Sequence, residues 1–271
     1  MESYHVWVGC CILLTEPLPG VNVMDFGAAA DGITEDTHAF IRAFSVASAT
    51  GTAAYIPERR KFAIKQVDVK SHVHMHLWGE IVNMSAVTFS IVESENISIN
   101  QRNTGGSPSK ISNIGGEVVV SGSRNVHIHS VGTPRLIIEN SRDVSLASLD
   151  AKRVSLVARC RSVTNSVHVV SSSISNVELT AEGKSTILGV SFDWVNIREN
   201  LSFYTDQEGG YIHNIYLYQT PVESLNRQVR GGIGGVNQSN PSNPSDSPVP
   251  CGEHVLVFED EKTLYNVMET A

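Results

Sequence analysis

Carboxylates that could cleave a glycosidic bond are scattered along this chain of 271 residues. Such a cleavage needs two carboxyl groups held about 5 to 9.5 Å apart, one of which acts as an acid. Asp193 directly precedes Trp194, and Asp206 lies two residues after Tyr204. An acid beside an aromatic ring is suited to binding a sugar, although aromatic residues are also common at the end of a hydrophobic core. Asp143 lies in a repeated part of the chain. We predict no catalytic residue, and name Asp143, Asp193 and Asp206 as the candidates if the protein is an enzyme.

Alternating histidines are a second pattern with possible chemistry. His72, His74 and His76 stand two residues apart, so on a β-strand all three side chains would point to one face. His127 and His129 repeat this spacing. Imidazoles so placed could share a metal ion, and three chains around an axis could present a ring of them, but an exposed histidine row is otherwise ordinary polar surface. We predict no metal and no cofactor, with His72, His74 and His76 as the ligands if a metal binds.

The composition is that of a globular acidic protein. Hydrophobic residues make up 41% and charged residues 18%, so the chain can bury a core. The formal net charge is −8 and no dense basic stripe is present, which argues against a nucleic-acid partner. No run of about 18 apolar residues occurs, so no membrane span is expected. Cys10, Cys11, Cys160 and Cys251 have the spacing of neither a disulfide framework nor a metal site, and we expect buried free thiols.

A repeat of 18 residues is the strongest structural signal. Aligning the chain on itself at this spacing superimposes apolar residues in columns two positions apart. The columns contain Val118, Leu136 and Val154; Val120, Ile138 and Leu156; Val126 and Val144; Ile128 and Leu146; and Val131, Leu149 and Val167. The preceding copy, with Phe89, Ile91, Ile97 and Ile99, fits at 29 residues because a polar loop around Arg102 to Gly116 is inserted. Such a repeat predicts an all-β fold, a single-stranded right-handed parallel β-helix.

Polar residues form columns at the same spacing. Glu117, Arg135 and Arg153 fall in one column, and Asn125, Asp143 and Arg161 in another, which predicts charge ladders on an outer face. Short polar residues also precede inward aliphatic residues at Asn96, Asn125, Asp143, Asn176 and Asn214. Because Asn and Asp tolerate tight turns, we expect these residues at the corners of the coils.

The segment from residue 21 to residue 64 has a more specific pattern. It contains the strings VNVMDFGA and DGITEDT, then a helical stretch, and then Tyr-Ile-Pro at Tyr55 to Pro57. The helix is expected from about Thr34 to Ala49, with Thr34 as its N-cap and Gly51 at its end. Phe40 and Phe44 would share its buried face.

This order of motifs resembles the N-terminal segment of the pectate-lyase superfamily, which includes phage tailspikes and polygalacturonase-like enzymes. There, an Asp-Phe-Gly-Ala strand, an Asp-Gly-x-Thr-x-Asp-Thr loop, an amphipathic helix and a Tyr-x-Pro strand cap the first coil. The resemblance covers about 45 residues and implies an N-terminal capping α-helix, with Asp25, Gly27, Asp31, Gly32, Asp36 and Pro57 as structural cap residues. One departure is Glu58, which stands where the superfamily usually has glycine.

The resemblance does not extend to catalytic motifs. Polygalacturonase-like enzymes carry Asn-Thr-Asp, Asp-Asp, Gly-His-Gly and Arg-Ile-Lys, and none of these strings occurs here. The nearest string, Asn103-Thr104-Gly105, lacks the carboxylate. Pectate lyases need a calcium-binding carboxylate cluster beside an arginine, which cannot be assembled from adjacent coils of this chain. The motifs therefore predict the fold and not the chemistry.

The expected organisation is one solenoid between two arms. Residues 1–20 form an N-terminal arm, 21–86 the capping segment and first coils, and 87–230 the parallel β-helix. Residues 231–250 are rich in Gly, Pro, Ser and Asn and read as a linker. Residues 251–271 form a C-terminal docking arm, with a strand at His254 to Phe258 and a short helix at Glu261 to Glu269. So few residues cannot form a core alone, so the arm must dock on this solenoid or on a neighbouring subunit.

Two main functions fit these observations. The first is a non-catalytic structural or attachment protein of a virion, tailspike-like or a capsid appendage, that works through assembly. Its partners would be further copies in a homotrimer, other virion proteins and a cell-surface polysaccharide. The alternative is a polysaccharide lyase or glycoside hydrolase with a site on the β-helix face or between subunits, and an extracellular adhesin is a third reading. We predict the first function, located in the virion, because the catalytic signatures are absent.

Overall fold

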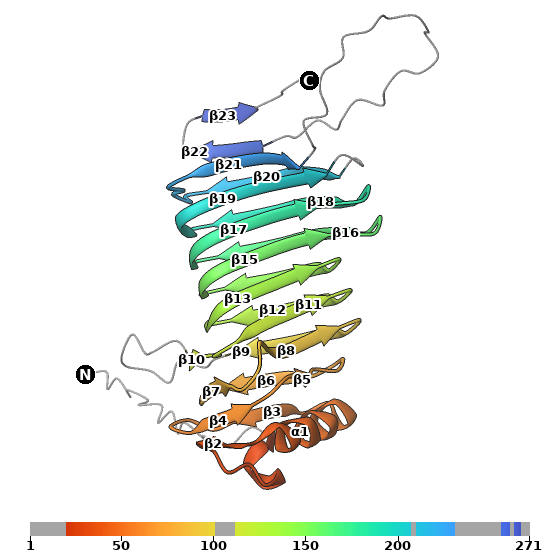
Figure 1. Cartoon of the computed structure of the whole chain (residues 1–271), viewed down its shortest axis with the longest axis vertical. Coiled ribbons are helices and arrows are strands. Elements are labelled where there is room, and N and C mark those ends of the chain that lie inside the picture. The colour runs from red at the N-terminus through yellow and green to blue at the C-terminus, as the bar shows by residue number, and fades with distance from the viewer. Residues whose placement is uncertain (1–19, 101–111, 207–209, 231–255, 261–262, 267–271) are drawn as a thin grey trace, which may run out of the picture.

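The chain folds into a right-handed parallel β-helix, as the repeat predicted (Figure 1). The computed structural model describes residues 20–100, 112–206, 210–230, 256–260 and 263–266. The expected N-terminal arm up to residue 19, most of the inserted loop and the linker at 231–250 lie outside these ranges. Figure 1 shows the coils stacked along the long axis, with the helix α1 (Thr37–Thr50) at the N-terminal end of the stack.

Three parallel sheets form the walls. Sheet A has 11 strands in the order β1 (Gly20–Asn22), β3 (Ala53–Ile56), β6 (His74–Leu77), β9 (Glu95–Asn100), β12 (Arg124–His129), β14 (Arg142–Ala147), β16 (Val163–Val170), β18 (Thr186–Asp193), β20 (Tyr211–Tyr218), β22 (Leu256–Asp260) and β23 (Thr263–Asn266). Sheet B has β2 (Asp31–Glu35), β4 (Lys61–Ile64) and β7 (Glu80–Asn83). Sheet C has 9 strands: β5 (Val67–Asp68), β8 (Val87–Val92), β11 (Glu117–Ser121), β13 (Val131–Glu139), β15 (Asp150–Ala158), β17 (Ser173–Ala181), β19 (Asn196–Asp206) and β21 (Leu225–Arg230) in order, with β10 (Ser112–Asn113) beside β13.

The inward columns have the predicted register over the middle coils. Leu136 pairs with Val118 on one side and with Val154 on the other, and all three side chains are buried. Ile138 pairs with Val120, and Val144 pairs with Val126, as predicted. The preceding coil also pairs with this one at the predicted offset of 29 residues. Each coil buries its aliphatic face only against its neighbours, which explains why the column positions repeat Val, Ile and Leu.

The 18-residue spacing ends after β15, which the sequence analysis did not foresee. Val167 pairs with Val144 and does not stack on Leu149, whose N–H donates to the hydroxyl of Ser172, 23 residues further on. Arg161 is likewise not in the column of Asp143, because it lies in the corner before β16. The extra residues of the longer coils are accommodated in corners, where they leave the inward columns undisturbed.

Left-handed residues form a ladder across the sheet A strands from β9 to β20, each directly before an inward aliphatic residue. Asn96, Asn125, Asp143 and Asn214 have φ between 52° and 57°, as expected for corner residues. Asn176 is an exception, since it is not among the positive-φ residues and lies at a register shift between β17 and β19. The side-chain amide of Asn125 donates to the oxygen of Asn96 at 2.6 Å, so the ladder continues from coil to coil through side chains.

Buried hydroxyls form a second ladder that was not predicted. The N–H of Ser94 donates to the hydroxyl of Ser123, and the N–H of Ser123 donates to that of Ser141, each at 3.1 Å. All three residues are buried. These bonds satisfy backbone donors at the corner where the chain leaves sheet C, because buried N–H groups need partners.

Cys160 is exposed, so the expectation of a buried thiol is wrong for this residue. It occupies a corner with φ of 58°, where its side chain cannot reach the inward columns. The other three cysteines lie outside the described residues.

The helix α1 begins later than predicted. Its N-cap position is Asp36 and not Thr34, whose hydroxyl donates instead to Asp31. The buried Asp36 carboxylate accepts hydrogen bonds from the N–H groups of Ala29 (2.6 Å) and Ala30 (3.2 Å), so it holds the preceding loop. Gly51 ends the helix with φ of 66°, as expected from its lack of a Cβ.

The remaining cap residues lie in turns around this helix. Asp25 is in a 3-10 helix (η1, Val23–Phe26) that ends at Gly27, with φ of 89°. Asp31 accepts from the N–H groups of Ile33 and Thr34, and these bonds lower the pKa of its carboxyl. Gly32 has φ of 77°, and Pro57 follows β3.

Phenylalanine side chains join the helix to the first coils. Phe40 packs edge-on against Phe62 of β4 with ring centroids 5.4 Å apart, and Phe44 lies 6.2 Å from Phe89 of β8. Both helix side chains are buried, so α1 covers apolar surface of the first coils. Within the described residues, no helix has the length and apolar character needed to cross a membrane.

The C-terminal residues continue sheet A. Strand β22 pairs in parallel with β20, aligning Leu256 with Ile215. The helix expected from Glu261 to Glu269 is wrong where the structure describes this segment, because Thr263–Asn266 is the strand β23, antiparallel to β22. A second strand gives the backbone groups of β22 partners that a separate helix would not supply.

Replacing Leu136 by Asp should prevent folding, because an unpaired carboxylate inside an aliphatic column costs several kcal/mol. The matched control is Ile137→Asp, one position along β13, where the side chain is only partly buried and the column is untouched. Circular dichroism and thermal unfolding measure the outcome. A soluble Leu136→Asp protein that melts cooperatively would contradict the register.

Candidate functional site

The three candidate carboxylates lie on separate parts of the solenoid. Asp143 is near the start of β14 and Asp193 ends β18, which is two coils further on and, by register, four residues further along the strand direction, so the two residues lie roughly 16 Å apart. Asp206 ends β19 in sheet C, three coils beyond Asp143, which at about 4.8 Å per coil is again more than 9.5 Å. The structure therefore does not bring these residues together as an acid–base pair.

Asp206 does line a cavity of about 460 Å³ between sheets C and A. Its Oδ2 accepts from the N–H of Gly183 at 2.6 Å, and its Oδ1 has no partner among the described residues. Arg159, in the same cavity, contacts Glu182 (Nε to Oε2, 3.0 Å) and also Glu139 (Nη1 to Oε1, 3.6 Å). The guanidinium lies between the two glutamates, in the space that a scissile bond would need.

His72, His74 and His76 do not form a metal site. His72 lies in a turn with φ of 63° and accepts from the amide of Asn96, whereas His74 is on β6 and bonds to the Ser98 hydroxyl at 3.0 Å. In the part of the chain that the structure describes, no three His, Cys, Asp or Glu side chains are grouped to hold an ion. The alternating histidines instead form polar surface on sheet A.

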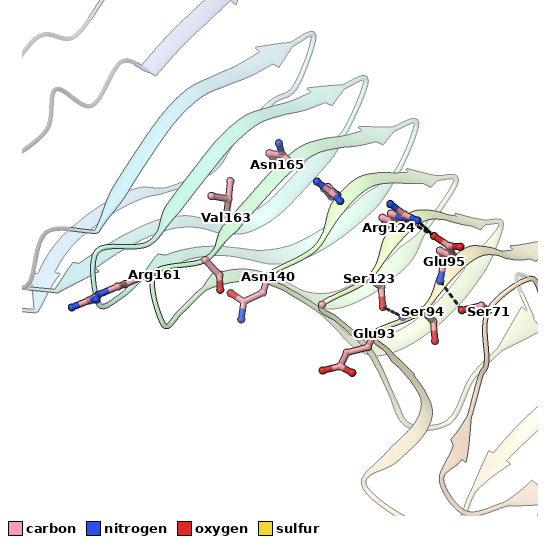
Figure 2. A pocket seen from close by; sticks show the side chains of 13 residues that line it. Ser71, Glu93, Ser94, Glu95, Ser123, Arg124, Asn140, Arg161, Val163 and Asn165 are labelled. Carbon is pink, nitrogen blue, oxygen red and sulfur yellow. Dashed lines mark hydrogen bonds and ion pairs between the residues drawn. The ribbon is translucent and has the colours of Figure 1, made fainter.

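A polar groove of about 840 Å³ runs along the corner between sheets C and A (Figure 2). It crosses the coils that contain β6, β9, β12, β14 and β16. Its lining consists of Ser71, Glu93, Ser94, Glu95, Gly122, Ser123, Arg124, Asn140, Arg142, Arg161, Ser162, Val163 and Asn165. Because successive coils contribute the same corner positions, the groove follows directly from the register.

The hydroxyls of this groove are committed to the fold. Ser94 and Ser123 belong to the buried ladder, and each also donates to a backbone carbonyl. The hydroxyl of Ser71 accepts from the N–H of Glu95 at 3.1 Å, and Figure 2 shows this bond at one end of the groove. Among the described residues, none of these three hydroxyls is paired with a histidine or a carboxylate that would activate it as a nucleophile.

The charged side chains give the groove its binding chemistry. Glu95 is paired with Arg124 at one end, and Glu93 points away from this pair (Figure 2). Arg142 lies in register between Arg124 and Asn165 on successive strands. Neither Arg142 nor Arg161 pairs with a carboxylate in the described part of the chain.

Asn165 adds an unsatisfied group. Its Oδ1 is buried and has no hydrogen-bond donor among the described residues. A buried acceptor without a donor costs about 1 to 3 kcal/mol, which a hydroxyl or water bound in the groove could recover. Two free guanidinium groups and an unused amide suit an anionic, hydroxyl-rich ligand.

Sequence reasoning did not single out Arg142, although a signal was present. Arg124 and Arg142 are one repeat apart, each two residues before an inward valine, so their side chains had to lie side by side. Arg161 was assigned to the wrong column and was therefore read as part of a ladder.

The other predicted ladder has the expected register. Glu117 pairs with Arg135, and their side chains are 3.3 Å apart, while Arg153 follows in the same column. Arg153 contacts Glu178 at 3.6 Å on the next coil. These partners lie outside the groove and neutralise one another.

Aromatic side chains are exposed at the C-terminal end of sheet A. Trp194 is 60% exposed and lies edge-on to Tyr218, with ring centroids 6.2 Å apart. The ring of Tyr211 stacks on that of His213 at 5.8 Å. Asp193 lies beside them and accepts from the hydroxyl of Ser191.

The chain belongs to the rhamnogalacturonase A/epimerase, pectate lyase-like family, whose profile matches residues 20–225. This match extends the N-terminal resemblance over the whole described solenoid up to β21. No curated protein sequence matches the chain.

One solved structure shows the same fold at low sequence identity, and two others give weaker matches. The surface adhesin PfbA of Streptococcus pneumoniae is 14% identical, with 78% of this chain and 79% of that chain covered and a TM-score of 0.51. Open reading frame 18 of Geobacillus virus E2 is also 14% identical, with coverages of 78% and 62% and a TM-score of 0.38. The A-module of the Azotobacter vinelandii mannuronan C-5 epimerase AlgE4 is 11% identical, with coverages of 77% and 95% and a TM-score of 0.30.

His129 on β12 makes the stability of the fold depend on pH. Partial burial, and then the neighbouring charge of His127, lower the pKa of His129 below its ordinary value. The unfolded chain therefore takes up this proton first as the pH falls below about 6.5, and stability is lost through that range. We expect the free energy of unfolding of wild type to fall more between pH 7.5 and pH 5 than that of His129→Gln. Equal losses, measured by urea titration, would contradict this environment.

Proposed function

We propose that this protein is a non-catalytic attachment protein that binds an acidic polysaccharide in the groove between sheets C and A. The observation that carries the proposal is the pair of arginines without carboxylate partners, Arg142 and Arg161, in a large polar concavity. A guanidinium binds a carboxylate through two parallel hydrogen bonds, and it stays charged at all relevant pH values.

The surroundings of the groove favour binding over turnover. A glycosidase needs a carboxyl acid opposite a second carboxylate, whereas Glu95 is occupied by Arg124 and Glu93 points elsewhere (Figure 2). The net charge of −8 repels polyanions at long range, so a uronate-bearing chain would be held by these local guanidinium contacts. A solenoid also offers a long, rigid surface on which a polymer can lie across several coils.

The location and assembly of the protein are part of the proposal. A surface adhesin has the same fold, which is compatible with a role in attachment outside a cell. We place the protein on a virion or a cell surface, and assign it a homotrimeric assembly with further virion proteins. The C-terminal strands would contribute to this assembly, since β22 extends sheet A at an edge that another copy could also offer.

The test replaces both free arginines. Arg142→Gln with Arg161→Gln should weaken binding of sodium polygalacturonate at pH 7.5 about 100-fold, because each charge-assisted contact contributes about 1.5 kcal/mol. The matched control is Arg153→Gln with Arg198→Gln, which removes the same charge from residues paired with Glu178 and Asp150 elsewhere. Isothermal titration calorimetry gives both dissociation constants. Equal affinities for the two double variants would contradict binding of the polysaccharide in the groove.

A second function, a lyase or hydrolase acting on a polysaccharide, is favoured by membership of a family named after such enzymes. Its best location is the cavity that contains Asp206 and Glu182. Shortening of polygalacturonate by the intact protein, abolished in Glu182→Gln or Asp206→Asn, would establish this alternative.

A further inference from the structure

Histidines are concentrated on one face of the solenoid. Eight histidines lie in the described residues, and six of them are on strands of sheet A. Each has buried aliphatic neighbours along its strand, so the imidazoles point outward. We call the outward side of β6, β9, β12, β14 and β16 the imidazole face. It carries His74, His76, His127, His129 and His168.

One column of this face alternates histidine and serine from coil to coil. His74 pairs with Ser98, Ser98 with His127, His127 with Ser145, and Ser145 with His168. Histidines in this column are therefore two strands, about 9.6 Å, apart. At this separation in water, positive charges on neighbouring histidines of the column would repel one another only weakly.

The partners of these imidazoles are mostly uncharged. His74 bonds to the Ser98 hydroxyl, His168 to that of Ser191 at 2.8 Å, and His127 to the amide oxygen of Asn125 at 2.9 Å. No ion pair with a carboxylate involves these three histidines within the described residues.

The fixed charges around the row sum to a small negative value. On the outward positions of β6 to β16, the charged groups are Glu95, Arg124, Arg142 and Asp143, two of each sign. From the flanking strands, Tyr55 of β3 and Asp193 of β18 face the row, and Glu259 of β22 continues the column of Asp193 by register. With Asp193 counted, the face therefore has a small net negative charge while its histidines are neutral, and it becomes cationic when they are protonated.

We propose that the imidazole face is an acid-dependent docking surface for the same anionic polysaccharide that enters the groove. This inference rests on the proposed function, because the two surfaces are continuous. Arg124 and Arg142 line the groove, and His127 lies only three residues beyond Arg124 on the same strand. Histidine is the side chain whose charge changes between pH 5 and pH 8, so a polyanion held weakly at neutral pH would gain a row of cations in acid.

A row of imidazoles would also offset the repulsion between this acidic protein and a polyanion, which the groove alone does not remove. An acidic protein that binds a polyanion has an unfavourable field to overcome, and a row of imidazoles reverses that field locally only when the surroundings are acidic. His129 lies on the same face, and partial burial lowers the pKa of its imidazole.

The test measures binding of dextran sulfate, whose charge does not change with pH, at pH 7.5 and pH 5.5 and constant ionic strength. Wild type should bind about tenfold more tightly at pH 5.5, because several exposed charge pairs each contribute a few tenths to 1 kcal/mol. The triple variant His74→Gln, His127→Gln, His168→Gln should keep its pH 7.5 affinity and lose this gain. The matched control is His38→Gln on α1, an exposed histidine outside the face, which should keep the gain.

The groove and the imidazole face can be contradicted by different results. Loss of pH 7.5 binding in the Arg142 and Arg161 double variant tests the groove, and does not depend on the histidines. Equal affinity of wild type at the two pH values, or a full gain in the triple variant, would overturn the imidazole face. Acid-strengthened binding to vesicles of anionic lipid but not to dextran sulfate, or acid-induced dimerisation in sedimentation, would assign the face to a different partner and would also overturn it.

Discussion

The stacking of inward aliphatic side chains on those of the neighbouring coil is the constraint on which the whole structure depends. A single coil buries too few aliphatic residues to form a core of its own, so each position in a column such as Val118, Leu136 and Val154 must be occupied and in register. Insertions are tolerated only where they leave the columns intact, which is why Cys160 and Arg161 lie in a corner. The groove lies along such corners, and the histidine row lies on outward positions, where the fold leaves residue type free.

The sequence predicted the solenoid well because its main signal is the same constraint. Period and column could be read from Val, Ile and Leu alone, and the corner asparagines at Asn96, Asn125 and Asn214 followed from their tolerance of positive φ. The prediction failed where coil length changed, since one residue of slip moves a side chain to another column, as happened to Val167 and Arg161. The start of α1 was misplaced because Thr34 was taken as the N-cap, whereas Asp36, expected only as one of the cap residues, holds that position and binds Ala29 and Ala30.

The site could not be predicted in the same way. A groove between corners depends on which arginines have no carboxylate across the coil, and that depends on the register of longer coils that repetition alone did not give. Arg135 and Arg142 look alike in the sequence, yet one faces Glu117 and the other has no acidic partner among the described residues. The carboxylates chosen for their aromatic neighbours, Asp193 and Asp206, lie apart because strand ends in different sheets do not converge. Family membership accounts for the fold of this protein, whereas the binding that we propose depends on the charges at its corners.

The central claim is that the solenoid binds an acidic polymer without cutting it. The most direct test incubates the intact protein for a day with end-labelled polygalacturonate, with and without calcium, and determines by size-exclusion chromatography both the bound fraction and the chain length. The account predicts that label co-elutes with the protein and that the released polymer keeps its starting length. A polymer that becomes shorter in the presence of the protein, or one that never co-elutes with it, would contradict the account.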